Sequence, residues 1–193
     1  MLDQTSALMP QRPLDKHHTL REELHLISKA LTSKGATLKT PIAHLVRRDP
    51  SAKAWSDSSL RAAGGYSTDL NFWWHIVWPP QVAQYTLVYV KTNKDGTLVS
   101  INVLEYAALL VNYAAACCYY LRNPPRDDPF PVVRFYVDNT SSEAWGMKGC
   151  TGSLIGRALS SLQCAMMIDS NVAARTARVD TKRNVIDQKQ TRM

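Results

Sequence analysis

The stretch Val132-Val-Arg-Phe-Tyr-Val-Asp-Asn-Thr-Ser-Ser-Glu-Ala-Trp145 decides the fold class. Its first six residues are apolar apart from Arg134, which is typical of a strand inside a sheet. Asp138 and Asn139 then end the strand, and a short helix is predicted to follow through Trp145. A strand that is followed by an acidic residue and then directly by a helix is typical of α/β proteins, in which strands and helices alternate. We therefore expect an α/β sheet with Asp138 at the carboxyl end of one of its inner strands.

Two further acids stand at the edges of apolar segments. Asp57 lies near the end of a predicted strand over 53–59, and Glu105 lies one turn into a predicted helix over 100–121. In such a sheet, strand ends and helix starts gather at one edge, so the three carboxylates meet there if the first and fourth strands are neighbours. Acids at strand ends and helix starts also have an ordinary role in turns and at the positive end of the helix dipole.

The chain has 16 Asp and Glu against 23 Lys and Arg, so a cluster of three carboxylates needs an explanation. Binding of a divalent cation is one such explanation. Carboxylates around a shared Mg²⁺ or Mn²⁺ stay ionised where they would otherwise repel each other. Two such ions about 4 Å apart can activate a water and stabilise the leaving oxygen of a phosphodiester. The net charge of +7 favours a polyanionic partner such as nucleic acid.

The chain divides into two parts. Residues 1–50 are interpreted as a loose tail, an amphipathic helix that begins at the capping-box pattern Thr19-Leu-Arg-Glu22 and a polar linker. Residues 51–193 form the main domain. Its closely spaced early strands predict an antiparallel meander, and its later alternation of strand and helix predicts parallel pairing.

The elements expected in the main domain follow one another in a fixed order. They are a strand over 53–59, a break or bulge at Gly64-Gly65 before Tyr66-Ser67, a strand over 72–78, a helix over 100–121, a strand over 132–137, a short helix to Trp145, a helix from Thr151 with Ile155, Leu159, Leu162 and Met166 inward, a strand over 173–179 and a final helix after Asp180.

Several patterns bear on the location of the protein. The four cysteines include no Cys-x-x-Cys pair, so we expect buried, reduced thiols in a cytoplasmic or nuclear protein. The first twenty residues hold no apolar stretch typical of a signal peptide. The apolar segment 99–121 contains Glu105, which is costly in lipid, and this favours a buried core helix and no membrane partner.

Taken in order, these motifs resemble the ribonuclease H-like domain of retroelement polyproteins, in particular the reverse transcriptase–ribonuclease H region of fungal or oomycete-type retrotransposons. The resemblance covers roughly residues 40–193, and residues 16–50 resemble the segment that joins the polymerase thumb to that domain. The matching motifs are Trp55-Ser-Asp-Ser-Ser, Gly64-Gly-Tyr-Ser, Phe72-Trp-Trp, Ile101-Asn-Val-Leu-Glu105, Asp138-Asn-Thr-Ser, Ser153-Leu-Ile-Gly-Arg157 and Asn184-Val-Ile.

The resemblance implies a five-stranded mixed sheet and a metal-dependent endonuclease that hydrolyses the RNA strand of RNA–DNA hybrids during reverse transcription. Three of the family's acids fall on Asp57, Glu105 and Asp138, which would bind two Mg²⁺ or Mn²⁺ ions. The implied contacts to nucleic acid fall on Asn139, Arg157, Lys182 and Arg183. The implied partners are a hybrid or another nucleic acid, and the remainder of a reverse transcriptase polyprotein.

The fourth acid of the family is displaced here. The family pattern Asn-x-x-Ala-Asp becomes Asn184-Val-Ile-Asp-Gln188, so Gln188 holds the acid position and Asp187 precedes it. On a helix, an offset of one residue rotates a side chain by about 100°. Two hypotheses follow: Asp187 serves as the fourth catalytic acid, or the domain is a degenerate module that binds nucleic acid or a protein partner without cleaving.

Two other patterns have simpler interpretations. Tyr136-Val-Asp-Asn139 is similar to the Tyr-x-Asp-Asp turn of reverse transcriptases, but that turn needs a second strand directly after its acids, and a helix is predicted here. The sequence therefore argues against a polymerase site. The aromatic residues Phe72, Trp73, Trp74 and Trp78 can stack on bases. Because consecutive residues of a strand face opposite sides, at least half of them belong to the core.

Overall fold

The structure is a computed structural model that describes residues 49–82, 99–148 and 154–180, together with Arg21, Leu24, His25 and Ser28. Those four residues are helical and exposed, in agreement with the helix expected near the N-terminus. The rest of that helix, most of the segment 81–98 and the final helix expected after Asp180 lie outside the described residues.

Five strands form one open sheet in the order β3-β2-β1-β4-β5. The strands are β1 (Ala52–Ser58), β2 (Ala62–Ser67), β3 (Phe72–Val77), β4 (Val132–Val137) and β5 (Ala173–Arg178). The first three pair antiparallel, whereas β1 with β4 and β4 with β5 pair parallel. The predicted mixed α/β sheet, with an early meander and later parallel strands, is therefore confirmed.

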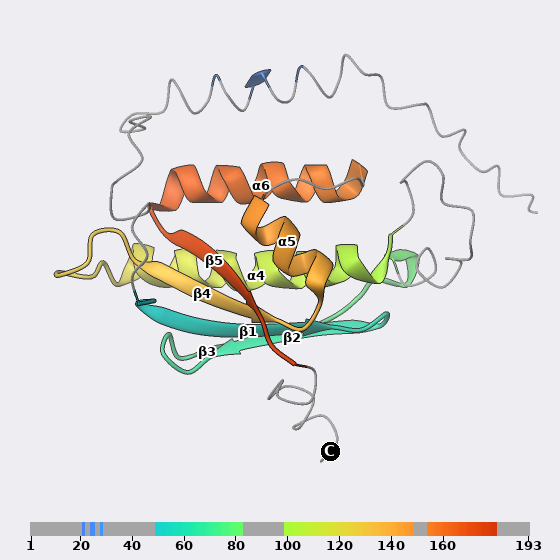
Figure 1. Ribbon diagram of the computed structural model, residues 1–193, viewed down its shortest axis with the longest axis horizontal. Coiled ribbons are helices and arrows are strands. Elements are labelled where there is room, and N and C mark those ends of the chain that lie inside the picture. The colour runs from blue at the N-terminus through green and yellow to red at the C-terminus, as the bar shows by residue number, and fades with distance from the viewer. Residues whose placement is uncertain are drawn as a thin grey trace, which may run out of the picture.

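Three helices lie on the same side of the sheet: α4 (Ile101–Arg122), α5 (Thr140–Lys148) and α6 (Leu154–Ser170) (Figure 1). The longest, α4, begins where the Ser100 hydroxyl accepts a hydrogen bond from the Val103 amide, which satisfies an N–H that has no partner within the helix. Along α4, 11 of 22 residues are buried. Because α4 is covered by the sheet on one side and by α6 on another, its apolar residues are spread around the axis rather than confined to one stripe.

The core lies between α4 and the sheet. Tyr113 meets Phe135 of β4 edge to face with ring centroids 5.7 Å apart, and its hydroxyl donates a 2.6 Å hydrogen bond to the carbonyl of Val172. By length and composition alone, α4 could also cross a membrane. Its tyrosines and asparagine instead make specific contacts with the sheet and with α6, as expected of a core helix.

Two expectations about these elements were wrong. Gly64 and Gly65 do not break the chain but lie inside β2. A Cβ at Gly65 would come within 2.6 Å of Trp74 Nε1, so glycine is needed there because another side chain already fills that space. Leu162 does not face inward but is 50% exposed, since α6 turns Ser160 and Gln163 toward α4 to bond the hydroxyl of Tyr106.

The cysteines also depart from expectation. Cys117 is buried as expected, and its thiol donates to the Ser170 hydroxyl, but Cys118 and Cys164 are exposed. Cys118 follows a buried position of α4 by one residue, which turns its side chain about 100° away from the core. Cys150 lies outside the described residues.

Candidate metal centre

Parallel pairing of β1 with β4 sets Asp57 beside Asp138. The register pairs Trp55 with Tyr136, and continuing it by two residues sets Asp57 level with Asp138. Asp57 is the sixth residue of β1, and Asp138 directly follows the last residue of β4. Because both strands run in the same direction, their carboxyl ends lie at one edge of the sheet, and the two acids lie there together.

Glu105 reaches the same edge from α4. It is the fifth residue of that helix and is 4% exposed, whereas Asp57 and Asp138 are partly exposed. The first turn of α4 is tied to the residue after Asp138, because the Asn139 side-chain amide donates a 2.9 Å hydrogen bond to Asn102 Oδ1. This contact links the helix that holds Glu105 to the strand end that holds Asp138.

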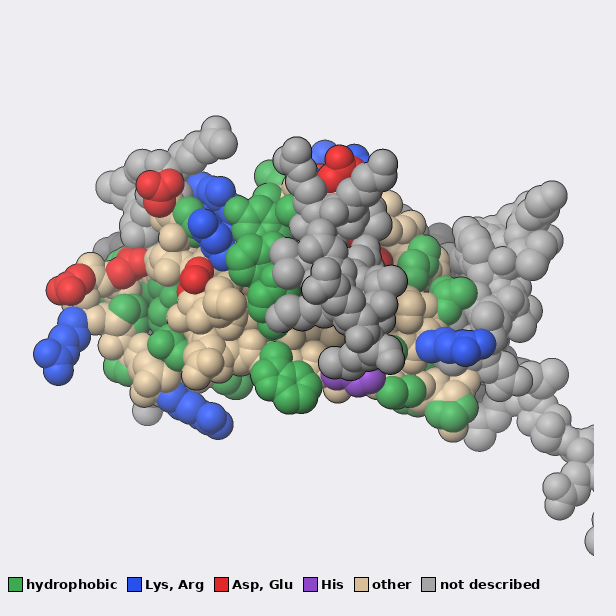
Figure 2. Space-filling view, turned by 90° about the horizontal axis from the view of Figure 1, so that it is seen from below, with side chains coloured by type: hydrophobic (Ala, Val, Ile, Leu, Met, Phe, Trp, Pro, Cys, Tyr) green, Lys and Arg blue, Asp and Glu red, His purple; other side chains and the backbone are tan. Residues whose placement is uncertain are grey.

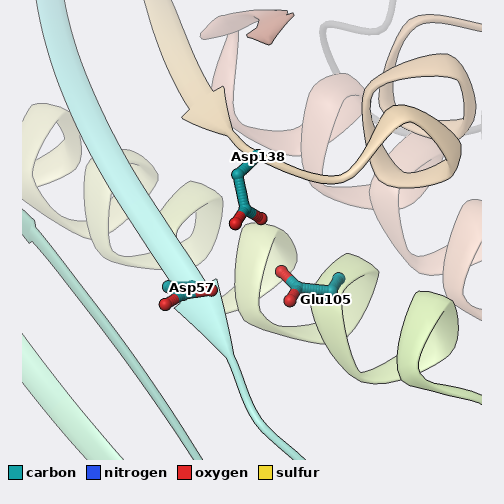
Figure 3. A group of neighbouring side chains, drawn as sticks. All are labelled: Asp57, Glu105 and Asp138. Atoms are coloured by element: carbon teal, nitrogen blue, oxygen red, sulfur yellow. The ribbon is translucent and has the colours of Figure 1, made fainter. Parts of the chain in front are cut away.

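The three carboxylates converge (Figure 3): each of Asp57, Glu105 and Asp138 offers one oxygen, and these oxygens all lie within 4.8 Å of one another. Two oxygens bound to one hard cation at about 2.1–2.5 Å can be no more than about 4.2–5 Å apart. The spacing is therefore close to what one hard divalent cation can bridge. The prediction that these three acids meet is confirmed.

The donor set indicates which kind of ion fits. All three groups are carboxylates, which suit hard cations such as Mg²⁺, Mn²⁺ and Ca²⁺ better than softer metals that prefer thiolate or imidazole. Three negative charges so close together repel each other, and a divalent cation relieves that repulsion. One Asp57 oxygen also accepts a 2.8 Å hydrogen bond from the Ser58 amide, which orients that carboxylate.

The other predicted site residues have different positions. Asn139 is the N-cap of α5: its side-chain oxygen accepts from the amides of Ser141 and Ser142 at 2.8 and 3.1 Å. Its side chain is therefore committed to the fold, which explains the residue without a contact to nucleic acid. Arg157 is exposed on α6. Asp187, Gln188, Lys182 and Arg183 lie outside the described residues.

Helix α5 follows Asp138 and Asn139 directly, as predicted. This excludes the strand–turn–strand arrangement of a polymerase Tyr-x-Asp-Asp turn at Tyr136. It also shows why the position after Asp138 holds an asparagine, because the asparagine side chain is among the best helix N-caps.

Sequence reasoning missed Asn102 as part of the site. Its only signal was an amide side chain in the first turn of an otherwise apolar helix, three residues before Glu105. An amide can both donate and accept, so it can bond a second amide from another segment. Its partner Asn139 is 37 residues away in the chain, and no local pattern identifies it.

No family model matches this chain, and neither do any curated protein or solved structure.

Proposed function

We propose that this chain is a ribonuclease H-like domain that acts as a divalent-metal-dependent endonuclease on the RNA strand of RNA–DNA hybrids. The observation that carries the proposal is the convergence of Asp57, Glu105 and Asp138 from β1, α4 and the end of β4. A cluster of carboxylates assembled from three separate elements in a basic chain suits a site that holds cations against a polyanion.

The three carboxylates would hold the metal ions. Divalent cations bound there would lower the pKa of a water molecule and offset the charge on the leaving 3′-oxygen. The chain contributes the positions of the ligands: one acid on β1, a second directly after the parallel strand β4, and a third on a helix that is packed against both strands. Burial of Glu105 keeps water away from one side of the cluster, so its interaction with a cation is screened less than at the surface.

The order of the motifs supports a role in reverse transcription of a retroelement. On this proposal the domain acts beside a polymerase, in the cytoplasm or the nucleus, and residues 1–50 connect the two. The nucleic-acid contacts proposed from the motifs are Arg157 on α6 and Lys182 and Arg183 near the C-terminus.

Cleavage of an end-labelled RNA–DNA hybrid tests the proposal, with single-stranded RNA and duplex DNA as comparison substrates. We expect cleavage of the RNA strand with Mg²⁺ or Mn²⁺ and none with EDTA. Asp138→Asn should lower the rate by at least about 100-fold, because an amide of the same shape binds these cations poorly. Asp127→Asn is the matched control, since Asp127 is exposed in the loop before β4 and lies outside the cluster.

A second function is favoured by one observation, the displaced acid at Asp187-Gln188. It is a non-catalytic module that binds nucleic acid or a protein partner. If the hybrid binds in a salt-sensitive way but is not cleaved with Mg²⁺ or Mn²⁺, the result favours the non-catalytic module over the nuclease.

A further inference from the structure

The side of the sheet away from the helices carries a row of aromatic side chains. Trp73 pairs with Tyr66, Tyr66 with Trp55, and Trp55 with Tyr136, so the row crosses β3, β2, β1 and β4. Trp55 stacks on both of its neighbours, with ring centroids 5.2 Å apart and the planes 10° and 19° from parallel. We call these four residues the aromatic row.

The neighbouring side chains show which way the aromatic row faces. Trp74 donates to Asn112 of α4, and Phe135 packs against Tyr113 of α4. Successive residues of a strand face opposite sides, so Trp73 and Tyr136 face away from α4. Figure 1 shows α4, α5 and α6 together on the other side of the sheet, so no described helix covers the aromatic row.

A second row on the same side carries positive charge. Lys53 pairs with Arg134, and Arg134 pairs with Arg175. Lys53 and Arg134 precede Trp55 and Tyr136 by two residues, so this basic row faces the same side about 7 Å away along the strands. Asp69 lies beside it and accepts from the Lys53 backbone amide. Figure 2 looks at the molecule from this side and shows green apolar side chains beside blue basic ones, with red acidic side chains among them.

We propose that the aromatic and basic rows form a binding surface for a single strand of nucleic acid, with bases stacked on the aromatic row and phosphates on the basic row. Ring faces stack on any base, and cationic side chains bind the phosphates. Trp73 at the end of the row is 81% exposed and Lys53 is exposed, so both are accessible to a ligand.

The positive charge of the basic row favours nucleic acid over an apolar protein partner. A surface that packs against another protein is depleted of charge at its centre, whereas here a row of three cationic residues runs parallel to the aromatic row. Along β1 and β4, in the direction of the chain, the basic row comes first and the aromatic row follows two residues later. Asp57 and Asp138 lie two residues beyond the aromatic row. A strand bound along them would lead toward the metal centre. That alignment rests on the proposed nuclease function, whereas the binding itself does not.

The test measures binding of a fluorescein-labelled thymidine 12-mer by anisotropy, with the full chain in EDTA. DNA and chelator remove any contribution from metal-dependent cleavage, so the result is separate from that of the hybrid assay. We expect Trp73→Ala to weaken binding by about 5- to 100-fold, as for the loss of one stacked base, and Trp73→Phe to restore most of it. The matched control is Val77→Ala, since Val77 is 69% exposed on the same side of β3.

The basic row has its own readout. Lys53→Gln should weaken binding and reduce the slope of log affinity against log salt by about 0.7, the value for one phosphate contact to a single strand. Equal affinities for Trp73→Ala and Val77→Ala, an unchanged salt slope in Lys53→Gln, or no binding by the wild type would each overturn the proposal. Self-association that Trp73→Ala abolishes, without binding of the 12-mer, would assign the surface to a second copy of the chain instead.

Discussion

The side-chain amide of Asn139 donates a hydrogen bond to the side-chain oxygen of Asn102, 2.9 Å away. Asn139 directly follows Asp138, and Asn102 lies three residues before Glu105 on α4. The same Asn139 side chain accepts from the first amides of α5. One residue therefore starts a helix and fixes the separation of two elements that carry the candidate metal ligands.

Substitutions at Asn139 separate these two roles. Asn139→Ala removes the cap and should lower the free energy of unfolding by about 1 kcal/mol in urea denaturation. Asn139→Ser keeps a capping oxygen but loses the donor to Asn102, so its stability should stay near that of the wild type. If the Asn102 contact positions Glu105, both variants lose cleavage rate. A fully active Asn139→Ser variant would show that the cap alone matters.

Metal binding should stabilise the fold. Three carboxylates lie within reach of one cation, so Mg²⁺ at ten times its dissociation constant should add about 1.4 kcal/mol to the free energy of unfolding. Asp138→Asn should lose most of this gain. In EDTA the same variant should be at least as stable as the wild type, because it removes one of three repelling charges.

Urea denaturation followed by fluorescence, with and without Mg²⁺, measures both effects. Asp127→Asn changes the same charge outside the cluster and should respond to Mg²⁺ like the wild type. An equal response of Asp138→Asn and Asp127→Asn would contradict metal binding at the cluster, whatever the result of the cleavage assay.

The two glycines of β2 should differ in their tolerance of a methyl group. A Cβ at Gly65 would collide with Asn112 and Trp74, whereas a Cβ at Gly64 would meet only the Trp74 carbonyl at 3.5 Å. We expect Gly65→Ala to cost about 1–3 kcal/mol. Gly64→Ala should be neutral or stabilising by up to about 1 kcal/mol, since alanine loses less backbone entropy on folding. Thermal unfolding of both variants compares them, and equal stability would contradict the packing described for Gly65.

The described cysteines should differ in reactivity. Burial raises the pKa of the Cys117 thiol, so at pH 8 less of it is the reactive thiolate, and reagents also reach it slowly. Cys118 and Cys164 are exposed. Alkylation by iodoacetamide, followed by peptide mass spectrometry, should modify both at least about tenfold faster than Cys117. In urea the three rates should converge, and a Cys117 that reacts as fast as Cys164 in the folded protein would show that α4 and α6 do not shield it.

The position of Asp187 beside Gln188 leads to a prediction that depends on the sequence alone. If Asp187 serves as the fourth acid, Asp187→Asn should reduce hybrid cleavage strongly. If it does not, Gln188→Asp should raise the rate, because it restores a carboxylate at the position that the family pattern requires. A wild type that stays inactive with Mg²⁺ and Mn²⁺, and is not rescued by Gln188→Asp, favours the non-catalytic module.

The sequence alone determined the local features of this protein. The apolar run before Asp138, the capping pattern after it and the long apolar segment around Glu105 each depend on contacts within a few residues. That is why the strand over 132–137 and the helix over 100–121 were predicted to within one residue of their observed ends. The three acids could be singled out for the same reason, since each stands at the edge of an apolar segment.

Only the tertiary structure decided which residues that are distant in the chain become neighbours. The register of β1 on β4, which sets Asp57 level with Asp138, joins residues 81 apart in sequence and follows from packing of the whole sheet against α4. The need for glycine at Gly65 comes from Trp74 and Asn112, and the outward turn of Leu162 comes from the polar contacts of α6 with Tyr106. These outcomes depend on partners distant in the chain, and the spacing of residues within one segment carries no information about them.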